Sequence, residues 1–216
     1  MINIIFFGPP GAGKGTQAKI ISNKLSLPHL STGDILRSKI KQNDNLALEV
    51  KDIIANGKLV PDNILNKIVS EKLIDDCKNG FILDGYPRTL DQSKFLNNLL
   101  NEYSLNLNYI FNISVNFELL TKRILNRSIE ENREDDNADV IKTRYQEYKN
   151  TTQKVSDFYK TDYKEIFHEV DGDAEIEEIT KKIIKILKNW WFLGKIYHFS
   201  TWLEPYKSCI HPHLFP

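Results

Sequence analysis

The chain has 216 residues, of which 41% are hydrophobic and 27% are charged, and these values are ordinary for a single globular core. Lysine plus arginine and aspartate plus glutamate both number 29, so the chain lacks the positive excess of proteins that bind nucleic acid or anionic membranes. Its two cysteines, Cys77 and Cys209, argue against a disulfide framework or a metal quartet. With no basic, apolar leader and no run of about 18 uncharged apolar residues, we expect a cytoplasmic protein.

Apolar runs alternate with amphipathic stretches, and short continuous apolar runs are typical of strands buried on both faces of a parallel sheet. Nearly continuous runs of this kind occupy residues 2–7, 80–85 and 108–115, and residues 164–170 are a weaker case. Apolar positions spaced about 3.6 residues apart predict helices. They cover residues 14–25, 33–42, 46–56, 62–76, 90–103, 117–126, 138–160 and 174–188. The alternation predicts an open, doubly wound α/β sheet flanked by helices, with its ligand site at the carboxyl ends of the strands.

Three segments interrupt this alternation. Residues 31–61 hold two helical patterns with no strand between them, which predicts a small helical insertion. Residues 127–137 are highly charged and predict a mobile surface loop. Residues 189–216 contain all three tryptophans but no regular period, and their scattered prolines oppose a stable helix. We predict a disordered tail there, with an aromatic docking or oligomerisation segment as the alternative.

The stretch FGPPGAGKGT, residues 7–16, has the G-x-x-x-x-G-K spacing of a phosphate-binding loop and lies between a predicted strand and a predicted helix. Glycines leave backbone N–H groups open to a phosphate, and Lys14 adds positive charge where the helix begins. The residues predicted to surround the phosphate are Gly11, Ala12, Gly13, Lys14, Gly15 and Thr16. A hydroxyl that contacts magnesium normally follows the lysine, but here it comes one step later. A turn that only packs the helix on the strand is the alternative.

Asp84 ends the predicted strand at FILDG, which a doubly wound sheet places beside the glycine loop. A carboxylate at this point can hold magnesium through water, because this ion gives up its water reluctantly. Taken alone, Asp84 would more often be a turn residue or a helix cap. The residues that follow it decide between these interpretations.

Three motifs follow one another along the chain: FGPPGAGKGTQA (7–18), STGDILR (31–37) and DGYPRTLDQ (84–92). Together they resemble the adenylate kinases among the nucleoside monophosphate kinases, over residues 1 to about 188. The resemblance implies magnesium-dependent phosphoryl transfer from ATP to AMP to give two ADP, on a P-loop sheet of five parallel strands. It also implies an AMP-binding helical insertion at 31–61, a short lid at 127–137 and a core formed by 1–30, 62–126 and 138–188.

The resemblance also accounts for the displaced hydroxyl, because the family's loop reads GKGT. It implies that magnesium lies between the nucleotide phosphates, largely hydrated and supported by Asp84. Only five residues separate Arg127 from Arg133, and none of them is a cysteine. We therefore expect none of the structural zinc that longer, cysteine-bearing lids hold. The expected partners are ATP, AMP and ADP, with no nucleic acid and no membrane, and the expected state is a monomer.

Arginines suit the implied reaction, because phosphoryl transfer asks mainly for positioning and positive charge, and a guanidinium grips two phosphate oxygens with fixed geometry. The resemblance assigns Arg37 and Arg88 to the AMP phosphate, Arg123 to the ATP adenine, Arg127 to the ATP phosphates, and Arg133 and Arg144 to the transferring phosphate. The expected catalytic residues are Lys14, Arg88, Arg123, Arg133 and Arg144. For Arg123 and Arg144, a solvated surface charge is the alternative. No general base is expected, because an AMP phosphate oxygen is already a competent nucleophile.

Two positions favour AMP over a pyrimidine monophosphate. Thr32 stands where the related UMP/CMP kinases typically have alanine, and Gln92 stands where they typically have asparagine. A glutamine amide offers both the donor and the acceptor that the adenine edge requires. The resemblance adds backbone contacts of Val60 with the AMP adenine and of Ala174 with the ATP adenine, so the expected AMP-binding residues are Thr32, Gly33, Arg37, Val60, Gly85, Arg88, Gln92, Arg133 and Arg144. A UMP/CMP kinase and a nucleotide-binding protein without catalysis are the alternatives.

Overall fold

A computed structural model of the chain describes residues 1–42, 45–77, 79–130 and 138–193. The elements in chain order are β1 (Ile2–Phe7), α1 (Lys14–Leu25), β2 (His29–Ser31), α2 (Thr32–Lys41), α3 (Asn45–Ala55), α4 (Asp62–Asp76), β3 (Gly80–Asp84), α5 (Leu90–Glu102), β4 (Tyr109–Ser114), α6 (Phe117–Glu130), α7 (Ala138–Glu147), a π-helical turn (Tyr148–Thr152), α8 (Gln153–Asp162), β5 (Phe167–Asp171) and α9 (Ile176–Leu193). The chain divides into two compact units, Met1–Thr180 and Lys181–Pro216, and the sheet belongs to the first. None of the helices in the described part of the chain has the length and apolarity that a bilayer crossing needs.

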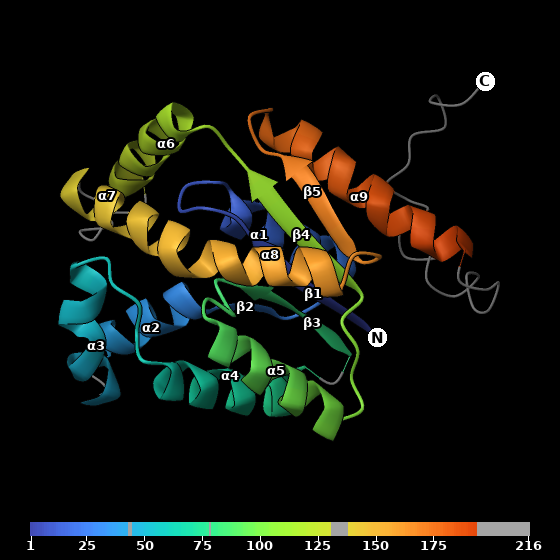
Figure 1. The fold of residues 1–216 in the computed structure, drawn as a ribbon, viewed down its shortest axis with the longest axis horizontal. Coiled ribbons are helices and arrows are strands. Elements are labelled where there is room, and N and C mark those ends of the chain that lie inside the picture. Colours follow the sequence, from blue (N-terminus) through green and yellow to red (C-terminus); the bar gives the residue numbers. More distant parts are fainter. Residues whose placement is uncertain (43–44, 78, 131–137, 194–216) are drawn as a thin grey trace. The chain divides into compact units, whose positions relative to one another are not determined.

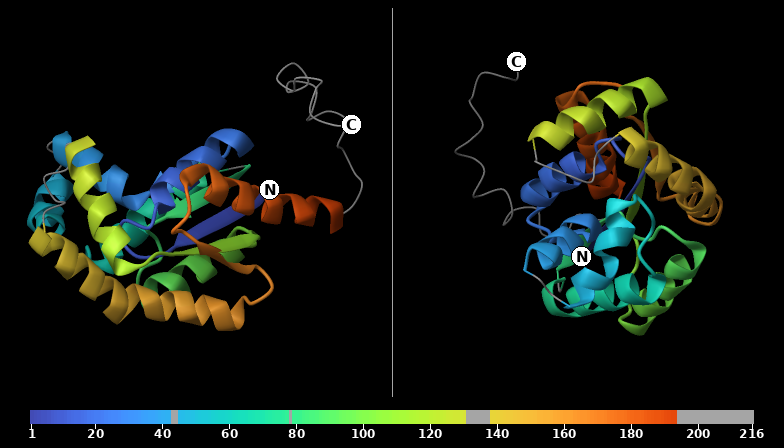
Figure 2. Two further views of the ribbon diagram at one scale, coloured as in Figure 1. Left: turned by 90° about the horizontal axis from the view of Figure 1, so that it is seen from above. Right: turned by 90° about the vertical axis from the view of Figure 1, so that its left-hand side faces the viewer.

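All five strands are parallel and lie in the order β2-β3-β1-β4-β5. Helix α1 covers one face of the sheet, and α5 and α8 cover the other (Figure 1, Figure 2). This arrangement confirms the predicted α/β sheet of five parallel strands flanked by helices. Because both faces are covered, Ile4, Ile5, Ile82 and Leu83 have no exposed surface, which explains the nearly continuous apolar runs in β1 and β3.

The strand register places three strand ends together. Asp84, the last residue of β3, pairs with Phe6 of β1 and with Ser31 of β2. The chain leaves β1 toward β2 on one side and leaves β3 toward β4 on the other. The direction of the connections therefore reverses at the carboxyl ends of β1 and β3, and open α/β sheets bind their ligands in such a crevice.

The main hydrophobic core lies between the sheet and helices α4, α5 and α8. Phe81, Leu96, Val155 and Tyr159 are fully buried members of it. The rings of Tyr159 on α8 and Phe7 on β1 lie 5.4 Å apart between centroids. This packing holds α8 next to β1, the strand that leads into the glycine loop. The π-helical turn directly precedes α8 in the chain.

Several element boundaries differ from those predicted. Strand β2 is not predicted from the sequence, because three residues are too few to give a periodic signal. The helix predicted over 138–160 is interrupted by the π-helical turn. Helix α6 continues to Glu130 and α9 to Leu193, beyond the predicted ends at 126 and 188. The remainder of the predicted lid and tail, 131–137 and 194–216, lies outside the described residues.

We expect Gly80→Ala to destabilise the fold severely. Gly80 begins β3 with a φ of 118°, and a Cβ there would lie 2.3 Å from the carbonyl oxygen of Ile2 on β1. Because the paired strands cannot separate without losing hydrogen bonds, the free energy of unfolding in a urea titration should fall by roughly 4 kcal/mol. Gly13→Ala is the control: its φ is 89°, but a Cβ would meet no atom within 4 Å, so the loss should be about 1–2 kcal/mol. Equal losses would contradict the steric explanation.

Candidate active site

A cavity of about 1050 Å³ opens at the carboxyl ends of β1, β2 and β3. Small-molecule sites usually measure roughly 300–1,000 Å³, so this cavity has room for more than one small ligand. Its walls come from the glycine loop, helices α2, α6 and α7, and the segment between α3 and α4. Among the predicted ligand-binding residues, those that line it are Gly11, Ala12, Gly13, Lys14, Gly15, Thr16, Thr32, Gly33, Arg37, Val60, Asp84, Gly85, Arg88, Arg123, Arg127 and Arg144.

The glycine loop directs Lys14 and the start of α1 toward this cavity. Helix α1 begins at Lys14, and Gly13 before it has a φ of 89°. Its first turn contains no acidic residue, so the positive end of the helix is available to an anion. Lys14 Nζ donates hydrogen bonds of 2.8 Å to the carbonyl oxygens of Gly8 and Pro9. The loop thus offers a phosphate an ammonium group and a helix N-terminus at the same place.

The charge of Lys14 is sensitive to pH near neutrality. Burial lowers the pKa of Lys14 to about 8, Asp84 opposes this shift, and Arg88 and Arg127 add to it. Free Lys14 is therefore charged below about pH 8 and increasingly neutral above it. A bound phosphate favours the charged ammonium, so binding raises the pKa and takes up a proton above that pH.

We expect the affinity for ATP to fall as the pH rises through about 8, by up to about tenfold per pH unit, because the neutral amine must be protonated on binding. Calorimetric titrations with ATP between about pH 7 and pH 9.5, in buffers of different ionisation enthalpy, measure both the affinity and the proton uptake. Lys14→Arg, whose guanidinium stays charged, should remove the uptake. An affinity that does not change with pH in the unaltered protein would contradict this expectation.

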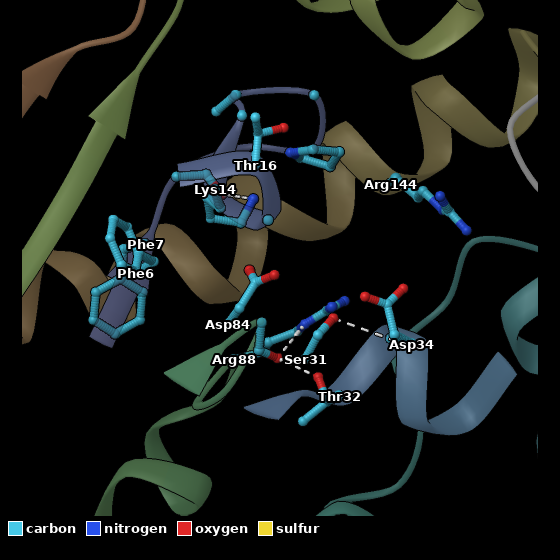
Figure 3. A pocket seen from close by; sticks show the side chains of 18 of the residues that line it. Phe6, Phe7, Lys14, Thr16, Ser31, Thr32, Asp34, Asp84, Arg88 and Arg144 are labelled. Carbon is cyan, nitrogen blue, oxygen red and sulfur yellow. Dashed lines mark hydrogen bonds between the residues drawn. The ribbon is translucent and has the colours of Figure 1, made fainter. Parts of the chain in front are cut away.

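Arg88 lies in the loop between β3 and α5, on the opposite side of Asp84 from Lys14 (Figure 3). Arg88 Nε donates to the carbonyl oxygen of Gly85 at 2.7 Å, and Thr32 Oγ1 donates to the same oxygen at 2.9 Å. A Cβ on Gly85 would meet Arg88 Nη2 at 2.7 Å. Glycine at this position therefore allows the guanidinium to lie over the strand end.

Two further arginines face Arg88 from other elements. Arg37 of α2 pairs with Asp34 at 2.5 Å, and Arg144 extends from α7 into the space above Asp34 (Figure 3). Burial lowers the pKa of Arg88, Asp84 raises it, and Arg144 and Arg37 lower it. The guanidiniums therefore repel one another across a shared space, and an anion entering that space relieves the repulsion.

On the other side of the glycine loop, α6 contributes Arg123 and Arg127 to the cavity wall. Arg123 Nη1 donates to the carbonyl oxygen of Gly172 at 2.8 Å, and Nη2 donates to that of Ala174 at 3.4 Å. Ala174 itself does not line the cavity; its carbonyl oxygen orients Arg123 instead. Arg123 and Arg144 both line the cavity, and backbone carbonyl oxygens hold Arg123 there.

Residues 6–164 match the family model described as adenylate kinase. An adenylate kinase of Leptospira biflexa serovar Patoc is 45% identical over 186 residues, which cover 86% of this chain and 99% of that protein. An adenylate kinase of Clostridium perfringens strain 13 is 39% identical over 214 residues, covering 86% and 97% of the two chains. One of Thermosipho melanesiensis is 37% identical over 215 residues, covering 87% and 100%. The chain belongs to the adenylate kinase family.

Membership of the adenylate kinase family confirms the activity predicted from the three motifs. The chain is a nucleoside monophosphate kinase, and its reaction is phosphoryl transfer between ATP and AMP. The UMP/CMP kinase alternative loses support, because the relatives are adenylate kinases. A binding protein without catalysis is likewise disfavoured, since the described cavity retains both Lys14 and Arg88.

The GKGT form of the adenylate kinase loop has a physical reason in this structure. A Cβ on Gly15 would lie 3.2 Å from Asp84 Oδ2, so a serine or threonine there would crowd the carboxylate. Asp84 is 8% exposed and points into the cavity between Lys14 and Arg88 (Figure 3). Among the described residues, no group of three or more acidic, histidine or cysteine side chains could hold a metal. The carboxylate of Asp84 is a ligand type that suits magnesium, which keeps most of its water and can meet a protein through a single carboxylate.

Gln92 and Arg133 differ from the other predicted residues. Arg133 lies outside the described residues. Gln92 is fully buried and does not line the cavity: its Oε1 accepts from the Arg88 N–H, and its Nε2 donates to Asp62, each at 2.7 Å. An adenine could contact this amide only after the groups that cover it moved aside. Thr152, by contrast, lines the cavity although no sequence pattern marks it.

Proposed function

We propose that the cavity binds ATP along the glycine loop and AMP beside α2 and residues 57–60, with the two phosphate chains meeting between Lys14, Arg88 and Arg144. The observation that supports this most is that these cations come from three separate elements and line one cavity around Asp84. Gly11 to Thr16, Arg123 and Arg127 would then contact ATP. Thr32, Gly33, Arg37, Val60 and Gly85 would contact AMP. The phosphate groups of ATP and AMP, placed end to end, would neutralise the positive charges of these lysine and arginine side chains.

Catalysis on this proposal rests on alignment and charge. An oxygen of the AMP phosphate attacks the γ-phosphorus of ATP, the bond from that phosphorus to the β–γ bridging oxygen breaks, and two ADP result. Lys14, Arg88 and Arg144 stabilise the negative charge of the transferring group and are held in place before it arrives. Binding both reactants in one cavity also removes most of the entropic cost of bringing them together.

Magnesium and the lid complete the proposal. Asp84 would hold the ion through water, and the ion would neutralise the phosphates of ATP. Residues 127–137, which include Arg133, would close over ATP and exclude the water that otherwise competes for the phosphoryl group. On this proposal the AMP-binding insertion comprises residues 31–61. The net charge of zero gives no general attraction to nucleic acid or anionic membranes, which supports the absence of those partners. We further infer that the protein is cytoplasmic, and the monomeric state stays a prediction.

An assay that couples ADP formation to NADH oxidation tests the proposal, with ATP as donor and AMP, CMP or UMP as acceptor. We expect kcat/KM for AMP to exceed that for either pyrimidine nucleotide by at least about hundredfold. Faster turnover with CMP would instead indicate a UMP/CMP kinase. Binding of ATP without ADP formation from any acceptor would indicate a nucleotide-binding protein that lacks catalysis.

A further inference from the structure

Arg88 lies in a loop outside the regular helices and strands. It lies between the end of β3 at Asp84 and the start of α5 at Leu90. Its backbone N–H and C=O therefore have no partner within a strand or a helix, and buried backbone groups need one. The direction of the guanidinium depends on how this peptide segment is fixed.

Two side chains hold the backbone groups of Arg88: Gln92 from the adjoining helix α5 and Thr152 from the distant π-helical turn. Its N–H donates to Gln92 Oε1 at 2.7 Å, and Gln92 is itself held by Asp62. Its carbonyl oxygen accepts from Thr152 Oγ1 at 3.2 Å. A carbonyl oxygen only accepts, so the threonine hydroxyl must be the donor. Thr152 is 8% exposed, so little water is available to replace its hydroxyl.

The π-helical turn explains why Thr152 reaches Arg88. The N–H of Gln153 donates to the carbonyl oxygen of Tyr148, five residues back, which is the bond of a π-turn with one extra residue. Thr151 in the same turn bonds to the carbonyl oxygen of Glu147 in its own helix, as threonines in helices commonly do. The Thr152 hydroxyl points out of the helix instead. Single π-turns inside α-helices often occur at functional sites.

The same helical run carries a second phosphate-facing cation. Arg144 lies on α7, which leads directly into the turn, and Arg144 is close enough to Arg88 to lower its pKa. The Thr152 hydroxyl therefore joins the loop that carries Arg88 to the helix that carries Arg144. Both guanidiniums line the cavity.

We propose that Thr152 is a positioning residue for AMP: its hydrogen bond to the Arg88 carbonyl oxygen fixes the loop so that the guanidinium meets the AMP phosphate. This inference rests on the proposed function, because it takes Arg88 as an AMP-phosphate ligand. Thr152 acts through Arg88 and touches neither nucleotide's reacting atoms. Its removal should affect AMP binding and leave ATP binding unchanged.

Calorimetric titration with AMP alone and with ATP alone tests the inference. Thr152→Val keeps the shape of the side chain but removes the hydroxyl and leaves a buried carbonyl without its partner, so the Kd for AMP should rise about tenfold. The Kd for ATP should stay within about twofold. Thr152→Ser, which restores a hydroxyl, should return the AMP Kd to within about twofold of the original value. If Thr152→Val does not fold, Thr152→Ala makes the same comparison.

Thr151→Val is the matched control, because it removes the neighbouring hydroxyl whose bond stays within its own helix. It should change neither Kd. In an Arg88→Ala background, Thr152→Val should have no additional effect on AMP binding, since a residue that acts through Arg88 cannot act without it. Equal losses of ATP and AMP affinity, or an additive loss in that background, would assign Thr152 a general structural role and overturn the inference.

The two levels of the proposal fail in different ways. An unchanged AMP Kd in Thr152→Val, beside a weakened one in Arg88→Ala, would overturn the positioning role and leave the proposed function standing. An unchanged AMP Kd in Arg88→Ala itself would overturn the assignment of Arg88 to AMP, and the inference with it.

Discussion

Arg88→Ala should lower kcat for the ATP–AMP reaction by about three orders of magnitude, because it removes the preorganised guanidinium that we propose stabilises the transferring phosphate. The fold should persist, since the side chain of Arg88 contacts the cavity and its own loop rather than the hydrophobic core. Steady-state kinetics with ATP and AMP, beside a thermal melt of each variant, measures both effects. The fold-decrease in kcat should be larger than the fold-change in the KM for ATP.

Arg88→Lys distinguishes charge from geometry at this position. An ammonium group keeps the charge but not the two-pronged grip of a guanidinium, so its kcat should lie between those of the original protein and Arg88→Ala. Turnover near normal in Arg88→Ala would remove the main support for the proposed site. A variant that melts far below the original protein would show instead that Arg88 is needed for folding.

Lys14→Met should lower kcat by at least about hundredfold, because it removes the ammonium group that we propose binds the ATP phosphates beside the glycine loop. Burial lowers the pKa of Lys14, so the charge is costly to the free protein. Replacing it with an apolar side chain of similar length should not lower the melting temperature. The expected result is a stable protein with little turnover, seen in the same kinetic assay.

Lys24→Met provides the matched control. Lys24 is an exposed residue in the last turn of the same helix, α1, and it does not line the cavity. The same substitution there changes the net charge and the helix composition in the same way, but turnover should be unaffected. If both variants lost activity equally, the effect would belong to the helix and not to the glycine loop.

The sheet and most of the cavity could be predicted because their signals are local. The runs of β1 and β3 are almost entirely apolar because both sheet faces are covered. The glycine loop and the DGYPR segment follow directly after these strands, and parallel strands bring their carboxyl ends to one edge. Strand β2 gave no signal because it is only three residues long.

The support around Arg88 could not be predicted in the same way. The bond from Thr152 to Arg88 joins residues 64 positions apart, and it depends on a π-turn inside a run whose periodicity predicts one continuous helix. Gln92 was predicted to face a base, yet its amide is occupied by the Arg88 N–H and by Asp62. The residue type supplies both a donor and an acceptor. Their partners are set by tertiary packing, which local sequence does not specify.

The account depends on two nucleotides lying end to end in the one cavity. A crystal structure with two adenosines joined by a chain of phosphates tests this directly. It should show the phosphates running past Lys14, Arg88 and Arg144, with one adenosine beside Arg123 and the other beside Thr32 and Val60. Either adenosine bound outside this cavity would contradict the account.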